Sequence, residues 1–131
     1  MMLLDSNIII YSAKREYAEL RGFLAENVYS VSAISIVEVL GYHLLGDKQR
    51  QYLIEFFKAA NILSISDSVV TEAVKLRQMR RMSLGDAIVA GTALDHRLAL
   101  ATRNVRDFSW IQSLSLINPL ESSELGEPES T

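Results

Sequence analysis

Four acidic residues stand where an apolar run meets a turn or a helix start, and their side chains suggest metal chemistry. In an open α/β sheet, ligands bind beyond the carboxyl ends of the strands. Carboxylate oxygens select hard cations such as Mg²⁺ and Mn²⁺, and Mg²⁺ often binds substrate phosphates as well. If the acids converge, they predict a divalent-metal site for phosphate chemistry. They are Asp5, Glu38, Asp86 and Asp107.

Apolar runs and helical spacing alternate along the chain and predict the elements that would carry these acids. Strands that alternate with helices of this length indicate a parallel sheet covered by helices on both faces. The fold class expected is therefore α/β. We expect strands at 2–4, 28–32, 62–65, 98–101 and 115–117, and helices from residue 8, over 16–27, 34–44 and 48–60, from 67 to about 81, and from 83 to about 97.

Composition limits the classes of protein that the chain can represent. Its 131 residues suit one domain, and 49% of them are hydrophobic, as in a globular protein. No apolar stretch approaches the roughly 18 residues of a membrane span, and the N-terminus lacks the basic region of a signal peptide. We therefore expect a cytoplasmic protein. The absence of cysteine excludes disulfides, thiolate zinc sites and a cysteine nucleophile.

The formal net charge of −3 is unevenly distributed. Residues 120–131 hold four acids and no base, which leaves 13 basic against 12 acidic groups in residues 1–119. A bound cation would neutralise part of the remaining acidic charge, so the body would present a basic surface to a phosphate chain. We expect residues 1–119 to form the domain and the acidic tail at 120–131 to be disordered.

Each acid also has a purely structural interpretation. Ser35-x-x-Glu38 and Ser83-x-x-Asp86 fit the capping box, in which an acid satisfies a free backbone N–H at a helix start. The other two acids could cap a helix or stabilise a turn. Capping does not explain why several acids should meet at one edge of one sheet, where like charges repel. A bound metal would remove that conflict.

Taken together, the segments around the acids resemble the PIN-domain family, most closely the VapC-type ribonuclease toxins of prokaryotic type II toxin–antitoxin pairs. The resemblance spans residues 2–118 and implies a three-layer α/β/α sandwich around a parallel sheet of four to five strands. Gly91 stands where such proteins more often have alanine, which should slightly loosen a helix. The segments are Leu4-Asp-Ser-Asn7, Ser35-Ile-Val-Glu-Val39, Asp86-Ala-Ile-Val-Ala-Gly-Thr-Ala-Leu94 and Ala101-Thr-Arg-Asn-Val-Arg-Asp-Phe108.

The resemblance implies an endoribonuclease in which the four acids hold Mg²⁺ or Mn²⁺ and hydrolyse RNA phosphodiester bonds. Other residues would assist, with Ser6 as a hydroxyl near the metal and Thr102 and Asn104 as polar neighbours of Asp107. Several arginines could contact RNA phosphates, although they could equally be solvated helix ends. These are Arg77, Arg80, Arg81, Arg103 and Arg106.

Two alternatives stay open beside this interpretation. The chain could be a noncatalytic module that uses the metal cluster only to bind RNA or a protein. A phosphotransferase with Asp5 as nucleophile is less well supported. Such enzymes normally have a second aspartate two positions after the first, and Asn7 stands there in this chain. The resemblance further implies a homodimer and an antitoxin partner, with apolar helix surfaces between Glu16 and Ala60 as the natural contact region.

Overall fold

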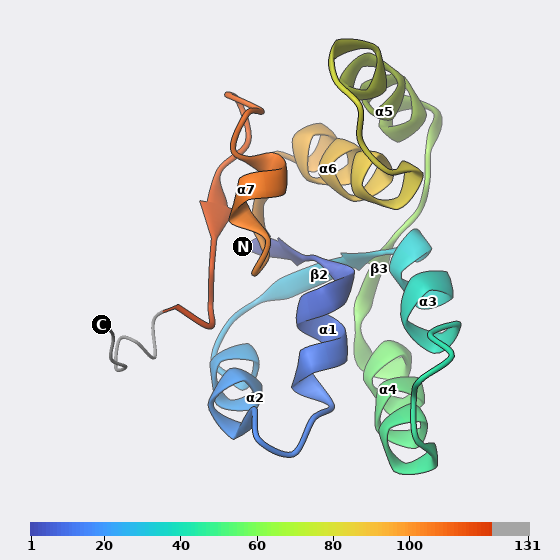
Figure 1. Ribbon diagram of the computed structural model, residues 1–131, viewed down its shortest axis with the longest axis vertical. Coiled ribbons are helices and arrows are strands. Elements are labelled where there is room, and N and C mark those ends of the chain that lie inside the picture. The colour runs from blue at the N-terminus through green and yellow to red at the C-terminus, as the bar shows by residue number, and fades with distance from the viewer. Residues whose placement is uncertain (122–131) are drawn as a thin grey trace.

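The computed structural model describes residues 1–121, which form a five-stranded parallel sheet with helices on both faces (Figure 1). The strand order is β3-β2-β1-β4-β5, so the first strand lies at the centre. The strands are β1 Met2–Leu4, β2 Tyr29–Ser32, β3 Asn61–Leu63, β4 Ala99–Ala101 and β5 Leu116–Ile117, and the helices are α1 Ser6–Ser12, α2 Ala18–Ala25, α3 Ala33–Leu40, α4 Asp47–Ala59, α5 Asp67–Met79, α6 Leu84–His96 and α7 Val105–Phe108.

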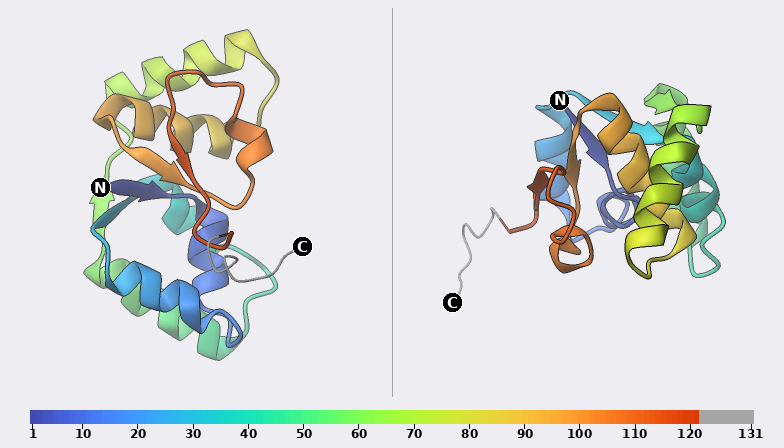
Figure 2. Two further views of the ribbon diagram at one scale, coloured as in Figure 1. Left: turned by 90° about the vertical axis from the view of Figure 1, so that its left-hand side faces the viewer. Right: turned by 90° about the horizontal axis from the view of Figure 1, so that it is seen from above.

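The two faces of the sheet bury different sets of helices, because side chains along a strand alternate between faces. Met2 and Leu4 belong to a core that includes residues of α1, α2, α3 and α4. Leu3 belongs to a second core with residues of α5, α6 and α7. Figures 1 and 2 show the resulting layers, with α5, α6 and α7 on one side of the sheet and α1, α2 and α4 on the other. The predicted α/β/α sandwich is confirmed.

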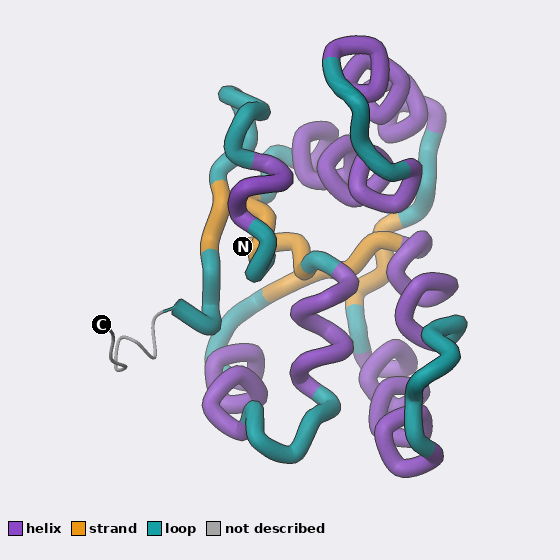
Figure 3. The backbone as a smooth tube through the Cα atoms, viewed as in Figure 1, coloured by secondary structure: helices purple, strands orange, loops and turns teal. Residues whose placement is uncertain are grey.

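The register of the central strands decides which residues meet at the carboxyl edge of the sheet. Leu4 pairs with Val31 of β2 and with Ala101 of β4. The residues that follow these partners are therefore level with one another, and the backbone N–H of Asp5 still donates to the Ala101 carbonyl at 2.9 Å. Figure 3 shows the orange strands at the centre of the molecule, between the purple helices.

Most predicted elements lie within a few residues of the observed ones, with three differences. The helix expected at 34–44 ends at Leu40, because Gly41 caps it and the chain then turns. The cap of α5 is Ser66, whose hydroxyl accepts a hydrogen bond from the Val69 N–H at 3.3 Å. The short helix α7 was not predicted, since four residues are too few to show a periodic pattern.

Within the described part of the chain, no helix combines the length and apolar character needed to cross a membrane. The expected tail begins in the last described turn, and residues 122–131 lie outside the described residues. The division into a domain at 1–119 and a tail at 120–131 therefore stays a prediction.

Helices α5 and α6 approach each other closely at Gly91. A Cβ atom at this buried position would lie 3.0 Å from the Val69 carbonyl oxygen and 3.1 Å from the Ala73 nitrogen, both backbone atoms of α5. Backbone atoms cannot rotate away as the end of a side chain can. The glycine thus permits this approach, which explains its departure from the alanine that the family resemblance suggests.

We expect Gly91→Ala to destabilise the protein, because the helices must move apart. Overpacking costs about 1–3 kcal/mol, which should exceed the gain of up to about 1 kcal/mol in helix propensity. Gly22→Ala in α2 is the matched control, since its added Cβ meets no atom within 4 Å. Chemical denaturation should give a lower free energy of unfolding for the first variant and a higher one for the second. Equal stabilisation by both would contradict the packing argument.

Candidate active site

Asp5 occupies the carboxyl end of β1 and is only 5% exposed. Its side chain does not cap α1, and its Oδ2 accepts a hydrogen bond from the Thr102 hydroxyl at 2.8 Å. Burial raises the pKa of Asp5 to about 6, against the lowering effect of the Thr102 hydrogen bond and with further raising by the charges of Asp86 and Glu38. This carboxylate is therefore held in place without being neutralised.

Glu38 lies on the second turn of α3, whose first residue follows the cap Ser32. Its Oε1 accepts a hydrogen bond of 2.6 Å from the Ser6 hydroxyl, which also lies 2.8 Å from the Ser35 hydroxyl. Because Ser6 has one hydroxyl proton and donates it to Glu38, Ser35 is the donor to Ser6. The capping-box alternative for Ser35 and Glu38 is therefore wrong, since both lie inside the helix.

The Glu38 carboxylate also lies against the backbone of Gly85, in the first turn of α6. A Cβ atom at Gly85 would overlap the Glu38 Oε2 atom and would stand 2.9 Å from its Cδ. Only glycine leaves this space open. Two elements thus determine where the Glu38 carboxylate sits, α1 through Ser6 and α6 through Gly85.

Asp86 lies in the first turn of α6. The cap of this helix is Ser83, whose hydroxyl accepts from the Asp86 N–H at 3.1 Å, as the sequence predicted. Burial raises the pKa of the Asp86 carboxyl, and the charges of Asp107 and Glu38 raise it further, while Ser83 lowers it. The capping role of Ser83 and a functional role of Asp86 are compatible.

Helix α6, which carries Asp86, is fitted tightly between its neighbours at two glycines. Gly91 faces the backbone of α5, and Gly85 faces the carboxylate of Glu38. The first contact lets α6 lie close to α5, and the second helps determine where the Glu38 carboxylate lies. The position of the acids therefore depends on helix packing several residues away from them. Precise placement of this kind is what catalytic carboxylates require.

Three of the predicted acids line one pocket of about 330 Å³. It opens at the carboxyl edge of the sheet, between α1, α3 and α6. The fourth acid, Asp107, is exposed on α7 and does not line this pocket, although its charge raises the pKa of Asp86. The residues around the pocket are Asp5, Ser6, Asn7, Ile10, Tyr11, Lys14, Glu38, Tyr42 and Asp86.

The donor set of the pocket fits a hard divalent cation. Its acidic oxygens come from carboxylates, and repulsion between them contributes to the raised pKa values of Asp5 and Asp86. A bound cation would relieve that repulsion. Among residues 1–121, however, no three such side chains are already arranged to hold an ion. Metal binding would thus require the carboxylates to close in on the cation.

The other predicted residues surround this pocket in different ways. Thr102 supports Asp5, and its hydroxyl accepts a hydrogen bond of 2.9 Å from the Asn104 N–H. Asn104, Arg103 and Arg106 line a neighbouring hollow together with Asp107. The side chain of Asn104 is exposed. Asn104 contributes only its backbone N–H to the hydrogen bonds around Asp5.

The arginines that precede α6 lie in different surroundings. Arg80 lies over the Trp110 ring, 5.4 Å from its centroid, and the indole N–H of Trp110 donates to the Asp107 carbonyl at 3.0 Å. Arg80 is therefore close to the helix that carries the fourth acid. Arg77 instead donates to the Met82 carbonyl at 3.3 Å and holds the loop before α6, while Arg81 is exposed.

Sequence reasoning did not identify Tyr11, Lys14, Tyr42 and Gly85 as parts of the site. The first three line the pocket, and Gly85 makes room for Glu38. Helical spacing could have indicated that Tyr11 lies on the same side of α1 as Asn7. Nothing in the sequence could have paired Gly85 with Glu38, since the two residues meet only through packing of α3 on α6.

Comparison with known proteins identifies the family. The family model described as the PIN domain matches residues 2–112. The chain belongs to the PIN-domain family. A comparison with curated proteins found no match. Among solved structures, a toxin–antitoxin complex from Klebsiella pneumoniae contains a chain with 32% sequence identity and a TM-score of 0.71, and the alignment covers 91% of this chain and 98% of that one.

Other solved structures share the fold of this PIN domain at lower identity. A chain of FitAcB from Neisseria gonorrhoeae has 24% identity and a TM-score of 0.72, with coverage of 92% of this chain and 99% of that one. A chain of DNA-bound VapBC from Salmonella typhimurium has 19% identity and a TM-score of 0.78, with coverage of 91% and 99%. The resemblance to PIN-domain proteins of toxin–antitoxin pairs is confirmed. As a member of a nuclease-like family, the chain is a candidate hydrolase of nucleic acid.

The raised pKa of Asp5 predicts how the stability of the metal-free PIN domain depends on pH. The folded protein retains a proton on Asp5 up to about pH 6, whereas the unfolded chain loses it near the ordinary value of 3.8. The stabilisation that Asp5 contributes to the folded state is therefore fully present below pH 3.8 and is lost as the pH rises through about 6. At about 1.4 kcal/mol per pKa unit, the loss is up to about 3 kcal/mol.

Asp5→Asn should consequently be more stable than the wild type in EDTA at pH 7.5, and the difference should shrink at pH 4.5. Thermal denaturation at both values measures it, with Glu26→Gln, an exposed acid at the end of α2, as the control. A stability difference that does not change with pH would contradict the electrostatic explanation.

The contact between Gly85 and Glu38 gives a second prediction. Gly85→Ala should displace the flexible Glu38 carboxylate, so Mn²⁺ affinity measured by calorimetry should fall by about 10-fold, the lower end for lost support of a ligand. Overall stability should change little. Adding Gly85→Ala to Glu38→Gln should then cause no further loss, because the affected carboxylate is already gone. Additive losses would show that Gly85 acts independently of Glu38.

Proposed function

We propose that this chain is a metal-dependent endoribonuclease, the VapC-type toxin of a VapBC-type toxin–antitoxin pair. The observation that carries the proposal is the meeting of Asp5, Glu38 and Asp86 in one pocket, although β1, α3 and α6 supply them from distant parts of the sequence. Membership of the PIN-domain family supports hydrolysis of nucleic acid. The resemblance described from the sequence supports RNA as the substrate.

In this proposal Asp5, Glu38 and Asp86 hold Mg²⁺ or Mn²⁺, and Asp107 joins them from α7. A cation bound there would lower the pKa of a water molecule and would stabilise negative charge on the phosphoryl group. The hydroxyls of Thr102 and Ser6 orient two of the carboxylates, since each donates a short hydrogen bond to one of them. These neutral donors leave the charge of the carboxylates available to the cation.

The proposed reaction is direct hydrolysis without a covalent intermediate. The oxygen of water forms a bond to phosphorus, and the bond between phosphorus and a ribose oxygen breaks on the opposite side. A pocket carboxylate takes the proton of the attacking water, and the leaving oxygen is protonated from solvent. Glu38 is suited to the first of these roles, because it is exposed and lines the pocket.

We further propose a cognate antitoxin and a homodimer as partners, acting in the cytoplasm. The similar chain from Klebsiella pneumoniae comes from a toxin–antitoxin complex, which supports the first partner. Exposed apolar side chains offer contact surface, and they extend beyond the helices between Glu16 and Ala60 that the sequence suggested. They include Val37 on α3, Val70 and Val74 on α5, and Leu84 on α6.

Cleavage of a labelled RNA panel tests the proposed activity. The purified protein, freed of antitoxin, should cut RNA with Mg²⁺ or Mn²⁺ and should not cut it in EDTA. Asp86→Asn should lower the rate by at least about 100-fold, because transition-state charge loses its stabilisation. Asp95→Asn is the matched control on the same helix, since Asp95 accepts a hydrogen bond from Ser68 outside the pocket. It should cut at the wild-type rate.

The results also separate the open alternatives. Cleavage that persists in EDTA and in the folded Asp86→Asn variant would rule out the metal mechanism. RNA binding without cleavage under any metal would instead identify a noncatalytic binding module. Circular dichroism of each variant shows whether a lost activity reflects a lost fold.

A further inference from the structure

A tyrosine at the rim of the carboxylate pocket holds two cations. The Nζ of Lys14 lies 5.3 Å from the centroid of the Tyr11 ring, and the guanidinium carbon of Arg103 lies 5.0 Å from the same centroid. Both distances are within the range of a cation–π interaction. Tyr11 and Lys14 line the pocket that contains Asp5, Glu38 and Asp86. Positive charge is therefore fixed beside the acidic pocket.

The loop that carries Lys14 is held rigidly from α2. The guanidinium of Arg21 donates to the carbonyl of Ser12 at 3.0 Å and to that of Lys14 at 2.7 Å. The N–H of Tyr17 also donates to the Lys14 carbonyl, at 3.1 Å. These bonds order the backbone of Lys14 before any ligand arrives, so little conformational entropy remains to be lost there on binding.

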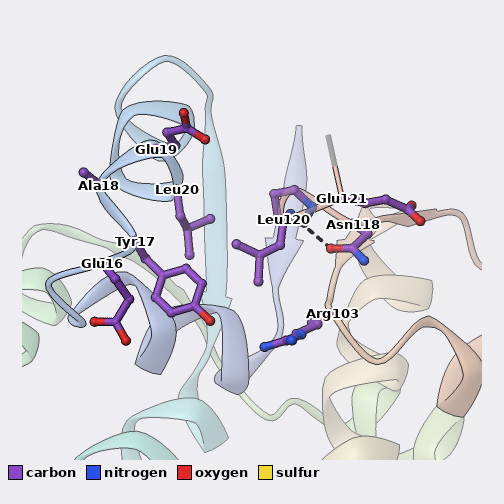
Figure 4. Close-up of a pocket in the computed structure, with 10 residues that line it drawn as sticks. Glu16, Tyr17, Ala18, Glu19, Leu20, Arg103, Asn118, Leu120 and Glu121 are labelled. Atoms are coloured by element: carbon purple, nitrogen blue, oxygen red, sulfur yellow. Dashed lines mark hydrogen bonds between the residues drawn. The ribbon is translucent and has the colours of Figure 1, made fainter. Parts of the chain in front are cut away.

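Arg103 is connected to the carboxylates through its own backbone. It lies between Thr102, whose hydroxyl donates to Asp5, and Asn104, whose N–H donates to the Thr102 hydroxyl. Figure 4 shows the Arg103 side chain extending toward the ring of Tyr17. The backbone of Arg103 thus belongs to the segment whose hydrogen bonds hold Asp5.

Neither cation has an ion-pair partner among the described residues. Within residues 1–121, no Asp or Glu oxygen lies within 4.0 Å of the Lys14 or Arg103 nitrogens, whereas Lys58 and Lys75 both have such partners. The aromatic ring holds the two cations in place while leaving their charge available. Such an arrangement suits an anionic ligand that approaches from solvent.

The surrounding hollows indicate the direction in which that ligand runs. Arg103 borders two of them. The larger, of about 610 Å³ and shown in Figure 4, is lined by Glu16, Glu19 and Glu121 and would repel an anionic chain. The other is lined by Arg103 and Arg106 and also by Asp107 and Glu121, so its cations and acids are equal in number and it repels an anion less than the larger hollow does. The favourable course for an anion therefore leads from the carboxylate pocket past Lys14 and Arg103 toward Arg106.

We propose that Lys14 and Arg103, held on the Tyr11 ring, bind a backbone phosphate of the RNA strand next to the bond that is cut. This inference rests on the proposed function, because it assumes that the carboxylate pocket is the cleavage site. A phosphodiester chain suits both parts of the site, since one phosphate would lie at the carboxylate pocket while its neighbour would lie at the two cations. Phosphate contacts of this kind position a nucleic acid without reading its sequence.

Binding of single-stranded RNA in EDTA tests the cation pair separately from cleavage. Fluorescence anisotropy with a labelled oligonucleotide should show that Lys14→Gln and Arg103→Gln each weaken binding by about threefold to tenfold, whatever the RNA sequence. The slope of log affinity against log salt should become less steep by about 0.7 for each variant. Lys58→Gln, which removes a cation of α4 outside the pocket, should bind like the wild type.

Two tyrosine variants test the supporting ring. Tyr11→Phe keeps the aromatic face but loses the hydroxyl that interacts with Arg103, so it should weaken RNA binding less than either cation variant does. Tyr11→Leu removes it and should approach the affinity of the lysine and arginine variants. In cleavage assays with metal, Lys14→Gln and Arg103→Gln should raise KM more than they lower kcat, because they alter substrate binding and leave the carboxylates intact.

The experiments distinguish a failure of the cation-pair proposal from a failure of the nuclease proposal. Cleavage by the wild type with an unchanged KM and salt slope in the Lys14 and Arg103 variants would overturn the cation pair and leave the nuclease standing. Absence of cleavage would overturn the nuclease, and the binding data in EDTA would still decide on the pair. Displacement of RNA by polyglutamate at equal charge concentration would assign the pair to an acidic peptide and would overturn the RNA assignment.

Discussion

Parallel pairing of β1 with both β2 and β4 is the constraint on which the site depends. Because Leu4 is level with Val31 and Ala101, the chain leaves all three strands at one edge of the sheet. The side chain of Asp5 then lies beside the Thr102 hydroxyl, 97 residues away in sequence. Helices α3 and α6 begin near this edge and bring two further carboxylates to it. A shift of this register would separate the groups.

Bringing these carboxylates together is electrostatically unfavourable, and the structure orients them with uncharged hydrogen-bond donors. A lysine or arginine bound to Asp5 or Glu38 would stabilise the charge but would compete with any cation for the oxygens. Hydroxyl groups of Thr102 and Ser6 orient these carboxylates instead, and they leave the negative charge largely uncompensated. Burial raises the pKa of Asp5 most, and the charges of Asp86 and Glu38 raise it further. Lys14, the cation that lines the pocket, is directed onto the Tyr11 ring.

The sequence by itself determined the layers of the fold and the identity of the acids. Apolar runs such as Met2–Leu4 and the capping serine Ser83 are local signals, and a local pattern is sufficient to place a strand or a helix start. The candidates Asp5, Glu38 and Asp86 followed from their positions next to such signals. The short α7 was missed because four residues are too few to show a period, and the end of α3 at Leu40 was missed because the apolar spacing continues to Leu44.

Only the tertiary structure decided which of these groups meet. It separated Asp107 from the pocket that holds the other acids, and it brought Lys14 and Arg103 to one tyrosine ring. It also showed that Ser35 supports Ser6 inside the protein and does not cap a helix. Such relations depend on strand register and on distances between side chains far apart in sequence. Periodicity and spacing carry no information about those distances, so no local pattern could have supplied them.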